Sequence, residues 1–234
     1  MTRLVIKKAA VLGAGVMGAQ IAAHLVNANI PVVLFDIPSK EADKNRTVRN
    51  AVNGLKKLQP LPFASADKVQ YIDIANYDDD LALLSECDLV IEAIAERIDW
   101  KNELYERLSP YFSPTAIIAT NTSGISIAAL ASGLPEAIQP RFCGVHFFNP
   151  PRYMALVEII PIPVSDKAML DALESWLTTH LGKSVIRALD TPNFIANRIG
   201  VFSLLAVMHH TAAFDLGFDE VDALTGPRIG RPKS

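Results

Sequence analysis

The sequence predicts an α/β protein with a doubly wound, mostly parallel sheet, followed by a helical segment at the C-terminal end. Three observations support this prediction. Short apolar runs typical of buried parallel strands alternate with segments of helical spacing. The first run is followed directly by a glycine-rich turn, and a long helical pattern follows the last run. We expect two domains, residues 1–189 and residues 190–234.

The first predicted strand, Ala9–Leu12, leads into a glycine-rich turn and then into a helix. The turn consists of Gly13, Ala14, Gly15, Val16, Met17 and Gly18. Gly13 permits the tight turn, Gly15 leaves room for a pyrophosphate, and Gly18 lets helix and strand pack closely. The N-terminus of the helix then directs its N–H groups and dipole toward the anion. This pattern predicts a Rossmann-type dinucleotide site.

Asp36 ends the second predicted strand, Val32–Phe35. A carboxylate at this place would accept hydrogen bonds from the ribose hydroxyls and repel the additional phosphate of NADP. A purely structural glycine turn would explain the glycines but not an acid at the end of the next strand. We therefore expect the site to bind NAD.

The alternation of strands and helices continues along the chain. Ser39–Leu58 has the pattern of an amphipathic helix, and Lys101, Leu104 and Leu108 lie on a second one. Further strands are predicted at Tyr71–Ile74, Asp88–Ile94, Ala116–Ala119, Phe142–Val145 and Ala155–Ile160. Ligands of doubly wound sheets bind outside the carboxyl ends of the strands, and Ser123 and His146 follow two of those ends.

Composition and charge argue against several other classes of protein. The net charge is −3 without a long Lys/Arg run, which argues against nucleic acid as a partner. Ile199–Met208 is too short an apolar stretch to span a membrane. Cys87 and Cys143 lie in or beside apolar strands, as buried thiols of a reducing compartment do. Since Met1–Arg3 lead directly into the first strand, we expect a cytoplasmic protein.

Glu158 stands inside a strand that is apolar on both faces. A carboxylate buried there without a partner would be costly or forced to protonate. The nearest candidate partner is His146, joined to it by the rigid turn Phe147–Pro151. A carboxylate on one imidazole nitrogen fixes the tautomer and leaves the other nitrogen to act as a base. The alternative is that His146 only ends its strand and Glu158 pairs with an arginine such as Arg152.

Two other chemistries fit the sequence less well. A Ser/His/acid hydrolase would need a G-x-S-x-G pattern, which does not occur around Ser123. His209 and His210 are adjacent and would diverge on a helix, and the sequence has no HExxH or CxxC pattern. We therefore expect no metal site.

Taken together, six motifs in this sequence resemble the L-3-hydroxyacyl-CoA dehydrogenase family. They are Gly13–Gly18, Glu92–Glu96, Asn121–Ser123, His146–Pro150, Leu156–Glu158 and Phe194–Arg198, in the family's order and over nearly the whole chain. The resemblance implies NAD-dependent oxidation of an L-3-hydroxyacyl-CoA to a 3-ketoacyl-CoA in fatty-acid β-oxidation.

The resemblance also implies a role for each matching position. His146 corresponds to the catalytic base and Glu158 to its partner, while Ser123 and Asn197 correspond to residues that hold the substrate's C3 oxygen and thioester. The positions that match the nicotinamide half of the NAD site are Glu96, Lys101, Ser123 and Asn149. No residue is assigned to CoA, because the segment between Asp36 and Asp88 is shorter than in the family.

The family continues with helices that cover the acyl chain and form a dimer interface. By resemblance, residues 190–234 begin an all-helical domain that is incomplete here, and the complete protein forms a homodimer through it. The closing Gly230–Ser234 resembles long bifunctional versions that also carry an enoyl-CoA hydratase region. We therefore expect these 234 residues to bind NAD and to be weakly active or inactive.

Two alternatives remain open. One is an NAD-dependent dehydrogenase of a free hydroxy acid or sugar acid, with the same fold and the same pair of residues. The other is a non-catalytic dinucleotide-binding relative. The combination of Ser123, His146, Glu158 and Asn197 argues against the latter, because a binding protein does not need a base.

Overall fold

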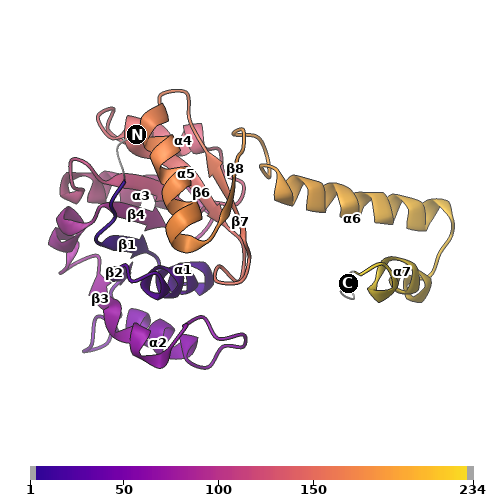
Figure 1. The fold of residues 1–234 in the computed structure, drawn as a ribbon, viewed down its shortest axis with the longest axis horizontal. Coiled ribbons are helices and arrows are strands. Elements are labelled where there is room, and N and C mark those ends of the chain that lie inside the picture. Colours follow the sequence, from indigo (N-terminus) through magenta and orange to yellow (C-terminus); the bar gives the residue numbers. More distant parts are fainter. Residues whose placement is uncertain (1–3, 231–234) are drawn as a thin grey trace. The chain divides into compact units, whose positions relative to one another are not determined.

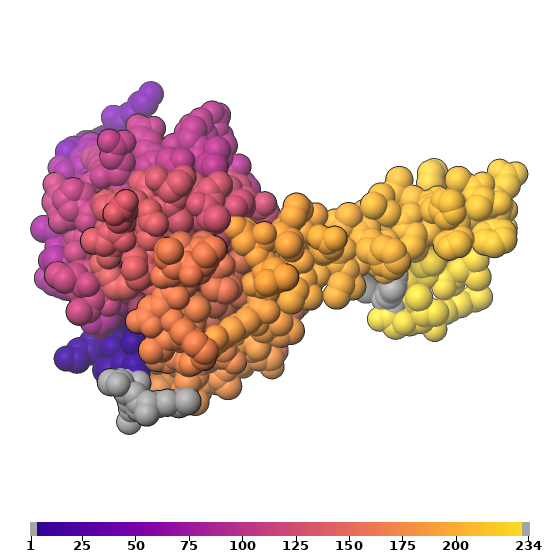
Figure 2. All heavy atoms as spheres, turned by 90° about the horizontal axis from the view of Figure 1, so that it is seen from above, coloured from indigo at the N-terminus to yellow at the C-terminus, as the bar shows by residue number. Residues whose placement is uncertain are grey.

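The computed structural model describes residues 4–230 of the chain (Figure 1). The chain divides into two compact units, Met1–Pro192 and Asn193–Ser234. The first unit holds the sheet and the helices around it. The described residues of the second form two α-helices and a short 3-10 helix, and the spheres of this unit run from orange to yellow in Figure 2. Two predictions rest on residues outside the described range. They are the cytoplasmic location inferred from Met1–Arg3 and the resemblance of the last residues, 231–234, to bifunctional proteins.

The sheet of the first unit has eight strands in the order β3-β2-β1-β4-β5-β6-β7-β8. The strands are β1 (Ala9–Leu12), β2 (Val32–Asp36), β3 (Ile72–Asn76), β4 (Leu89–Glu92), β5 (Ile117–Thr120), β6 (Phe142–Phe147), β7 (Leu156–Ile160) and β8 (Ser184–Arg187). Every neighbouring pair is parallel except β6 and β7. The strand order reverses between β1 and β4, where ligands of doubly wound sheets bind. The predicted fold class is confirmed.

Helices cover both faces of this sheet. The helices of the first unit are α1 (Val16–Asn27), α2 (Arg46–Leu55), α3 (Ile98–Leu108), α4 (Ile127–Ala131) and α5 (Lys167–Leu181). Side chains of α1, α2 and α5 share one hydrophobic core with alternate strand residues such as Ala9 and Val11. The residues between them, such as Ala10 and Leu12, are equally buried and belong to the opposite face. Burial on both faces explains the nearly continuous apolar strands.

The predicted helix over Ser39–Leu58 is wrong in its extent, because α2 covers only Arg46–Leu55. The Ser39 N–H donates to the Lys44 carbonyl at 2.8 Å, which closes a turn in place of a helix. The Asp43 carboxylate accepts hydrogen bonds from the Asn45 N–H and the Arg49 guanidinium. Asp favours such local bonds with the backbone, so the helix begins only after it.

The second unit contains α6 (Ala196–Ala213) and α7 (Phe218–Thr225). The long helical pattern after the last strand is thus present as α6, which begins at Ala196 because Asn193 and Phe194 have φ values of 64° and 48°. The apolar side chains of Phe202 and Phe218 are exposed. Among residues 4–230, none of the helices has the length and apolar character needed to cross a membrane.

Both cysteines are buried and neither forms a disulfide. Burial raises the pKa of Cys87 and of Cys143 to about 12, so both remain protonated thiols at neutral pH. They are therefore packing residues, as predicted. In the part of the chain that the structure describes, no group of His, Cys, Asp and Glu side chains could hold a metal ion.

His24, on α1, is a buried packing residue that should make the protein sensitive to acid. Burial and, secondarily, the charge of Lys183 lower its pKa to about 4, from 6.5. The unfolded chain therefore binds more protons between pH 4 and 6.5, and stability falls as the pH falls through this window. From pH 7 to pH 5 this one group should remove about 2 kcal/mol of unfolding free energy.

Urea unfolding at both pH values measures this loss. The His24→Leu variant should lack this 2 kcal/mol component, whereas substitution of the exposed His180 on α5 should leave it in place. An equal loss in the His24→Leu variant and the unsubstituted protein would show that another group is responsible.

Candidate functional site

The glycine turn between β1 and α1 leaves open space at the N-terminus of the helix. Gly13 has φ of 101°, and a Cβ on it would lie 2.8 Å from the Ala93 carbonyl oxygen. A Cβ on Gly18 would lie only 1.9 Å from the Gly13 carbonyl oxygen, so both positions require glycine. A Cβ on Gly15 would meet nothing within 4 Å, and no side chain caps the helix. The turn therefore offers a cradle for an anion.

Asp36 is fixed against this turn. One carboxylate oxygen accepts from the Ala14 N–H at 2.7 Å, and the other from the Ile37 N–H at 2.7 Å. Asp36, Gly13 and Gly15 line a pocket of about 510 Å³. Its other lining residues follow β2, β3 and β4 or lie on α3, and are Ile37, Tyr77, Ala93, Ile94, Ala95, Trp100, Glu103, Leu104 and Arg107. The volume suits a nucleoside-sized ligand.

Tyr77 is a pocket residue that the sequence analysis missed. Its ring stacks on Phe35 with centroids 5.9 Å apart, and it is 3% exposed. Its hydroxyl lies near the backbone of Gly13 and has no side-chain hydrogen-bond partner within residues 4–230. Burial and the nearby Asp36 raise the pKa of the phenol well above its usual value, so it stays a donor. An aromatic residue directly after the end of β3 was the signal that could have identified it.

Glu96 joins the loop after β4 to the loop after β5. One of its carboxylate oxygens accepts hydrogen bonds from the Thr122 hydroxyl, the Ser123 N–H at 2.8 Å and the Gly124 N–H at 3.2 Å. Burial acts to raise the pKa of Glu96, but these hydrogen bonds and the charge of Lys101 together outweigh it and hold the pKa below its usual value. The predicted residues Glu96 and Ser123 are thus neighbours.

Lys101 lies beneath this loop in a buried ion pair. Its ammonium donates to a Glu92 carboxylate oxygen at 2.5 Å and lies 3.6 Å from Glu96. Glu92 also accepts from the Tyr105 hydroxyl at 2.9 Å and the Thr120 hydroxyl at 2.6 Å. Glu92 and Lys101 are both 0% exposed. Lys101 therefore contacts the predicted site through Glu96, and its buried ammonium helps to hold the Glu96 carboxylate in place.

His146 and Glu158 face each other across the antiparallel pair β6 and β7. The distance between His146 Nδ1 and Glu158 Oε2 is 2.8 Å, and the two residues are 3% and 0% exposed. Arg152, the alternative partner, donates instead to the Leu61 and Phe63 carbonyls. The hydrogen bond expected between His146 and Glu158 is present.

Two asparagines tie the end of β6 to its surroundings. The Asn121 side chain accepts from the Phe147 N–H at 2.9 Å, which links the ends of β5 and β6. Asn149 accepts from the Gln20 side chain of α1 at 3.2 Å. Asn149 is thereby held toward the helix that follows the glycine turn. Asn197 lies in the first turn of α6, in the second unit.

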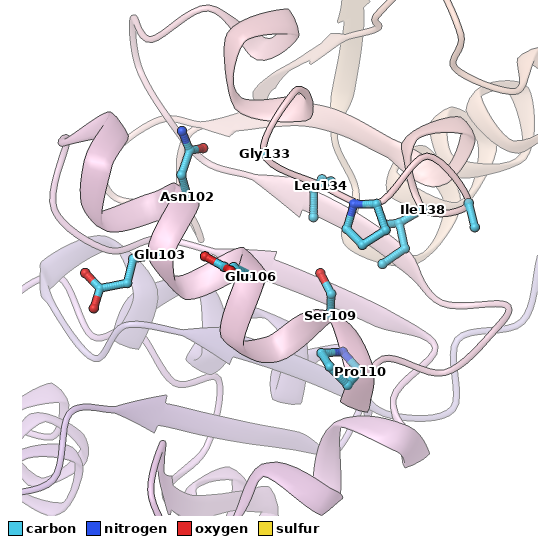
Figure 3. A pocket seen from close by; sticks show the side chains of 10 residues that line it. Asn102, Glu103, Glu106, Ser109, Pro110, Gly133, Leu134 and Ile138 are labelled. Carbon is cyan, nitrogen blue, oxygen red and sulfur yellow. The ribbon is translucent and has the colours of Figure 1, made fainter.

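A larger pocket, of about 770 Å³, lies away from these residues (Figure 3). It is bordered by α3 and by the chain around Gly133–Ile138. Asn102, Glu103 and Glu106 of α3 line it on one side, and Leu134 and Ile138 line it on the other. None of the predicted site residues in the described part of the chain lines it, so its volume does not identify the functional site.

Comparison with known proteins gives a consistent match. The family described as "3-hydroxyacyl-CoA dehydrogenase, NAD binding domain" matches residues 8–191. A probable 3-hydroxyacyl-CoA dehydrogenase of Deinococcus radiodurans is 45% identical over 231 residues, which cover 98% of this chain and 66% of that protein. A putative fatty acid oxidation complex trifunctional enzyme of Rickettsia prowazekii is 44% identical over 230 residues, covering 98% of this chain and 32% of that protein.

A solved structure has the same fold as this chain. The crystal structure of M. tuberculosis FadB2 superimposes with a TM-score of 0.76 at 30% sequence identity. The superposition covers 96% of this chain and 80% of that one. The chain spans 32–66% of the length of the two curated relatives described above.

Proposed function

Since the chain belongs to the 3-hydroxyacyl-CoA dehydrogenase family through its NAD-binding domain, we propose that it oxidises an L-3-hydroxyacyl-CoA to the 3-ketoacyl-CoA. NAD is the cofactor of this domain. The single observation that carries the proposal is the buried hydrogen bond between His146 and Glu158. His146 lies near the carboxyl end of β6, and the pocket lined by Gly13 and Asp36 lies at the carboxyl ends of neighbouring parallel strands.

The open glycine turn and the acid at the end of β2 support the binding of NAD at this site. The open space at Gly15 and the start of α1 would hold the pyrophosphate, and Asp36 would accept from the adenosine ribose. Glu96, Ser123 and Asn149 would border the nicotinamide half, with Lys101 holding Glu96 from below. When bound, NAD supplies the ring that accepts the hydride.

The protein's part in the reaction is proton transfer and orientation. Because Nδ1 of His146 donates to the Glu158 carboxylate, the lone pair of the neutral ring lies on Nε2. His146 would take the proton of the substrate's 3-hydroxyl through this nitrogen, and Glu158 would stabilise the imidazolium that forms. Ser123 and Asn197 would hold the C3 oxygen and the thioester carbonyl.

We expect Asp36→Asn to weaken NAD binding about tenfold and to reduce the preference for NAD over NADP. The amide keeps an acceptor for the Ala14 N–H but loses the charge that attracts the ribose hydroxyls and repels a phosphate. Titration of both dinucleotides against protein fluorescence measures the two dissociation constants. Asp73→Asn, an exposed acid on β3, is the matched control. An unchanged ratio of the two constants would remove Asp36 from cofactor selection.

The activity itself is tested by NADH formation from L-3-hydroxyacyl-CoA substrates of several lengths, compared with free 3-hydroxy acids. We expect turnover only with the thioesters. The assay should use both the 234 residues and a longer chain with further helices, because the 234 residues span only 32–66% of the length of the two curated relatives. Equal activity with free hydroxy acids would favour a dehydrogenase of another substrate class.

We also propose that the protein forms a homodimer through its helical domain. The exposed apolar side chains of Ile199, Phe202 and Phe218 support this proposal, because large exposed apolar groups favour association. Sedimentation of the longer chain tests it.

A further inference from the structure

The turn that joins His146 to Glu158 is held by a buried lysine that has no assigned role. Lys183 precedes β8 and is only 3% exposed. Its ammonium donates to the carbonyl oxygens of Pro151 and Met154, the latter at 2.8 Å. Immediately beside it, the Ser184 N–H donates to the Ala155 carbonyl at 2.8 Å. The carbonyls of Pro151, Met154 and Ala155 are thus bound by Lys183 and Ser184, at the start of β8.

In residues 4–230 the ammonium of Lys183 donates to these two carbonyls and forms no ion pair with a carboxylate. Its charge acts on the nearby imidazole of His24 on α1. Burial lowers the pKa of Lys183 to about 8, from 10.5. Burying an ammonium without a counter-ion is unfavourable, so its place here indicates a task beyond stability. One ammonium carries three N–H donors and can donate to both carbonyls at once.

A second cation holds the same turn from its other side. The Arg152 guanidinium donates to the Leu61 carbonyl at 2.7 Å and to the Phe63 carbonyl at 2.6 Å. The Tyr153 hydroxyl donates to the Leu61 carbonyl as well, at 2.9 Å. Arg152 and Tyr153 are therefore bound to the segment Leu61–Phe63, while Lys183 binds the carbonyl of Pro151, which is closer to Asn149.

The position of Pro151 is transmitted directly to Asn149. Only Pro150 separates them, and both prolines have φ restricted to a narrow range. The backbone between them has little freedom to rotate, so a shift of the Pro151 carbonyl also shifts Asn149. Asn149 in turn contacts Gln20 on α1 at 3.2 Å.

We propose that Lys183 is a positioning residue that fixes Asn149, through Pro151, for the nicotinamide half of NAD. The inference rests on the proposed function, which assigns Asn149 to that half. Lys183 touches neither cofactor nor substrate. Its effect should therefore fall on the nicotinamide half and spare the adenosine half, which binds at the glycine turn and Asp36.

Binding of NAD and of ADP-ribose, which lacks the nicotinamide, tests this inference by calorimetry. Lys183→Met should weaken NAD binding about tenfold and change ADP-ribose binding less than about twofold. Lys183→Arg, which keeps a charged donor, should restore part of the NAD affinity. The control is Lys167→Met, which removes an exposed lysine at the start of α5. Circular dichroism checks folding, and Lys183→Gln, with one donating amide, replaces the methionine variant if that does not fold.

Two results would overturn the inference. Equal weakening of NAD and ADP-ribose would mean that Lys183 acts on the fold as a whole, and unchanged binding of both would mean that it positions nothing. Failure of the unsubstituted chain to bind NAD is a separate result, since it would overturn the proposed function and this inference with it.

Discussion

Replacing His146 by alanine should lower the turnover number by about 10²–10⁴-fold and leave the affinity for NAD nearly unchanged. The substitution removes the proposed base, whereas the glycine turn and Asp36 that would bind the cofactor belong to other strands. The measurement is NADH formation from an L-3-hydroxyacyl-CoA in the longer chain, with NAD binding titrated separately.

Two further variants make this result specific. Glu158→Gln keeps a side chain of the same shape opposite His146 but loses the charge, so we expect an intermediate loss of turnover. His180→Ala removes an exposed histidine of α5 and should have no effect. Unaltered turnover in the His146→Ala variant would exclude His146 from the mechanism.

Replacing Lys101 by methionine should lower the unfolding free energy by about 3–5 kcal/mol. The substitution leaves the Glu92 carboxylate buried with the hydroxyls of Tyr105 and Thr120 but without its cation. Urea unfolding of the 234-residue chain measures the loss. The second substitution Glu92→Gln, made in the same chain, should recover part of it because no buried charge then remains.

Lys167→Met is the matched control for this prediction as well. It removes a lysine from an ion pair with Asp171, but its side chain is exposed and Asp171 keeps its ion pair with Arg187. We therefore expect little change in stability. A Lys101→Met variant as stable as the unsubstituted chain would show that the buried pair is not needed for folding.

Local patterns were sufficient to predict the parallel half of the sheet and the dinucleotide turn. Strands such as Ala9–Leu12 could be recognised from their own residues, because burial on both faces leaves a continuous apolar run. The edge strand β8 was not predicted, because most of its residues are exposed and it has no such run. Glu158 identified its partner for a related reason. A carboxylate inside such a run needs a donor, and the nearest one along the chain proved to lie directly opposite.

Contacts between distant segments could not be predicted in this way. Asp190 accepts hydrogen bonds from the Ser126 hydroxyl and from the N–H groups of Ile127 and Ala128, so it caps a helix more than sixty residues before it. Nothing in either segment alone indicates this contact. The start of α2 was misjudged because the side chain of Asp43 competes with the helix for backbone hydrogen bonds.

The same limit applies to the candidate site. From the sequence, Lys101 was expected beside the cofactor, but only the packing of α3 against β4 shows that its ammonium is paired with Glu92. Tyr77 stands before three aspartates that resemble a solvated loop, and its burial depends on stacking with Phe35 of the neighbouring strand. Periodicity reports which face of an element is buried, not which side chains meet there.

A crystal structure of the chain with NAD bound is the most direct test of the central claim. A base and a hydride acceptor must lie on either side of one carbinol carbon. We therefore expect His146 Nε2 about 5–7 Å from the C4 atom of the nicotinamide, with Glu158 still bonded to Nδ1. A nicotinamide on the opposite side of the sheet from His146, or a Glu158 carboxylate turned to solvent, would contradict the account.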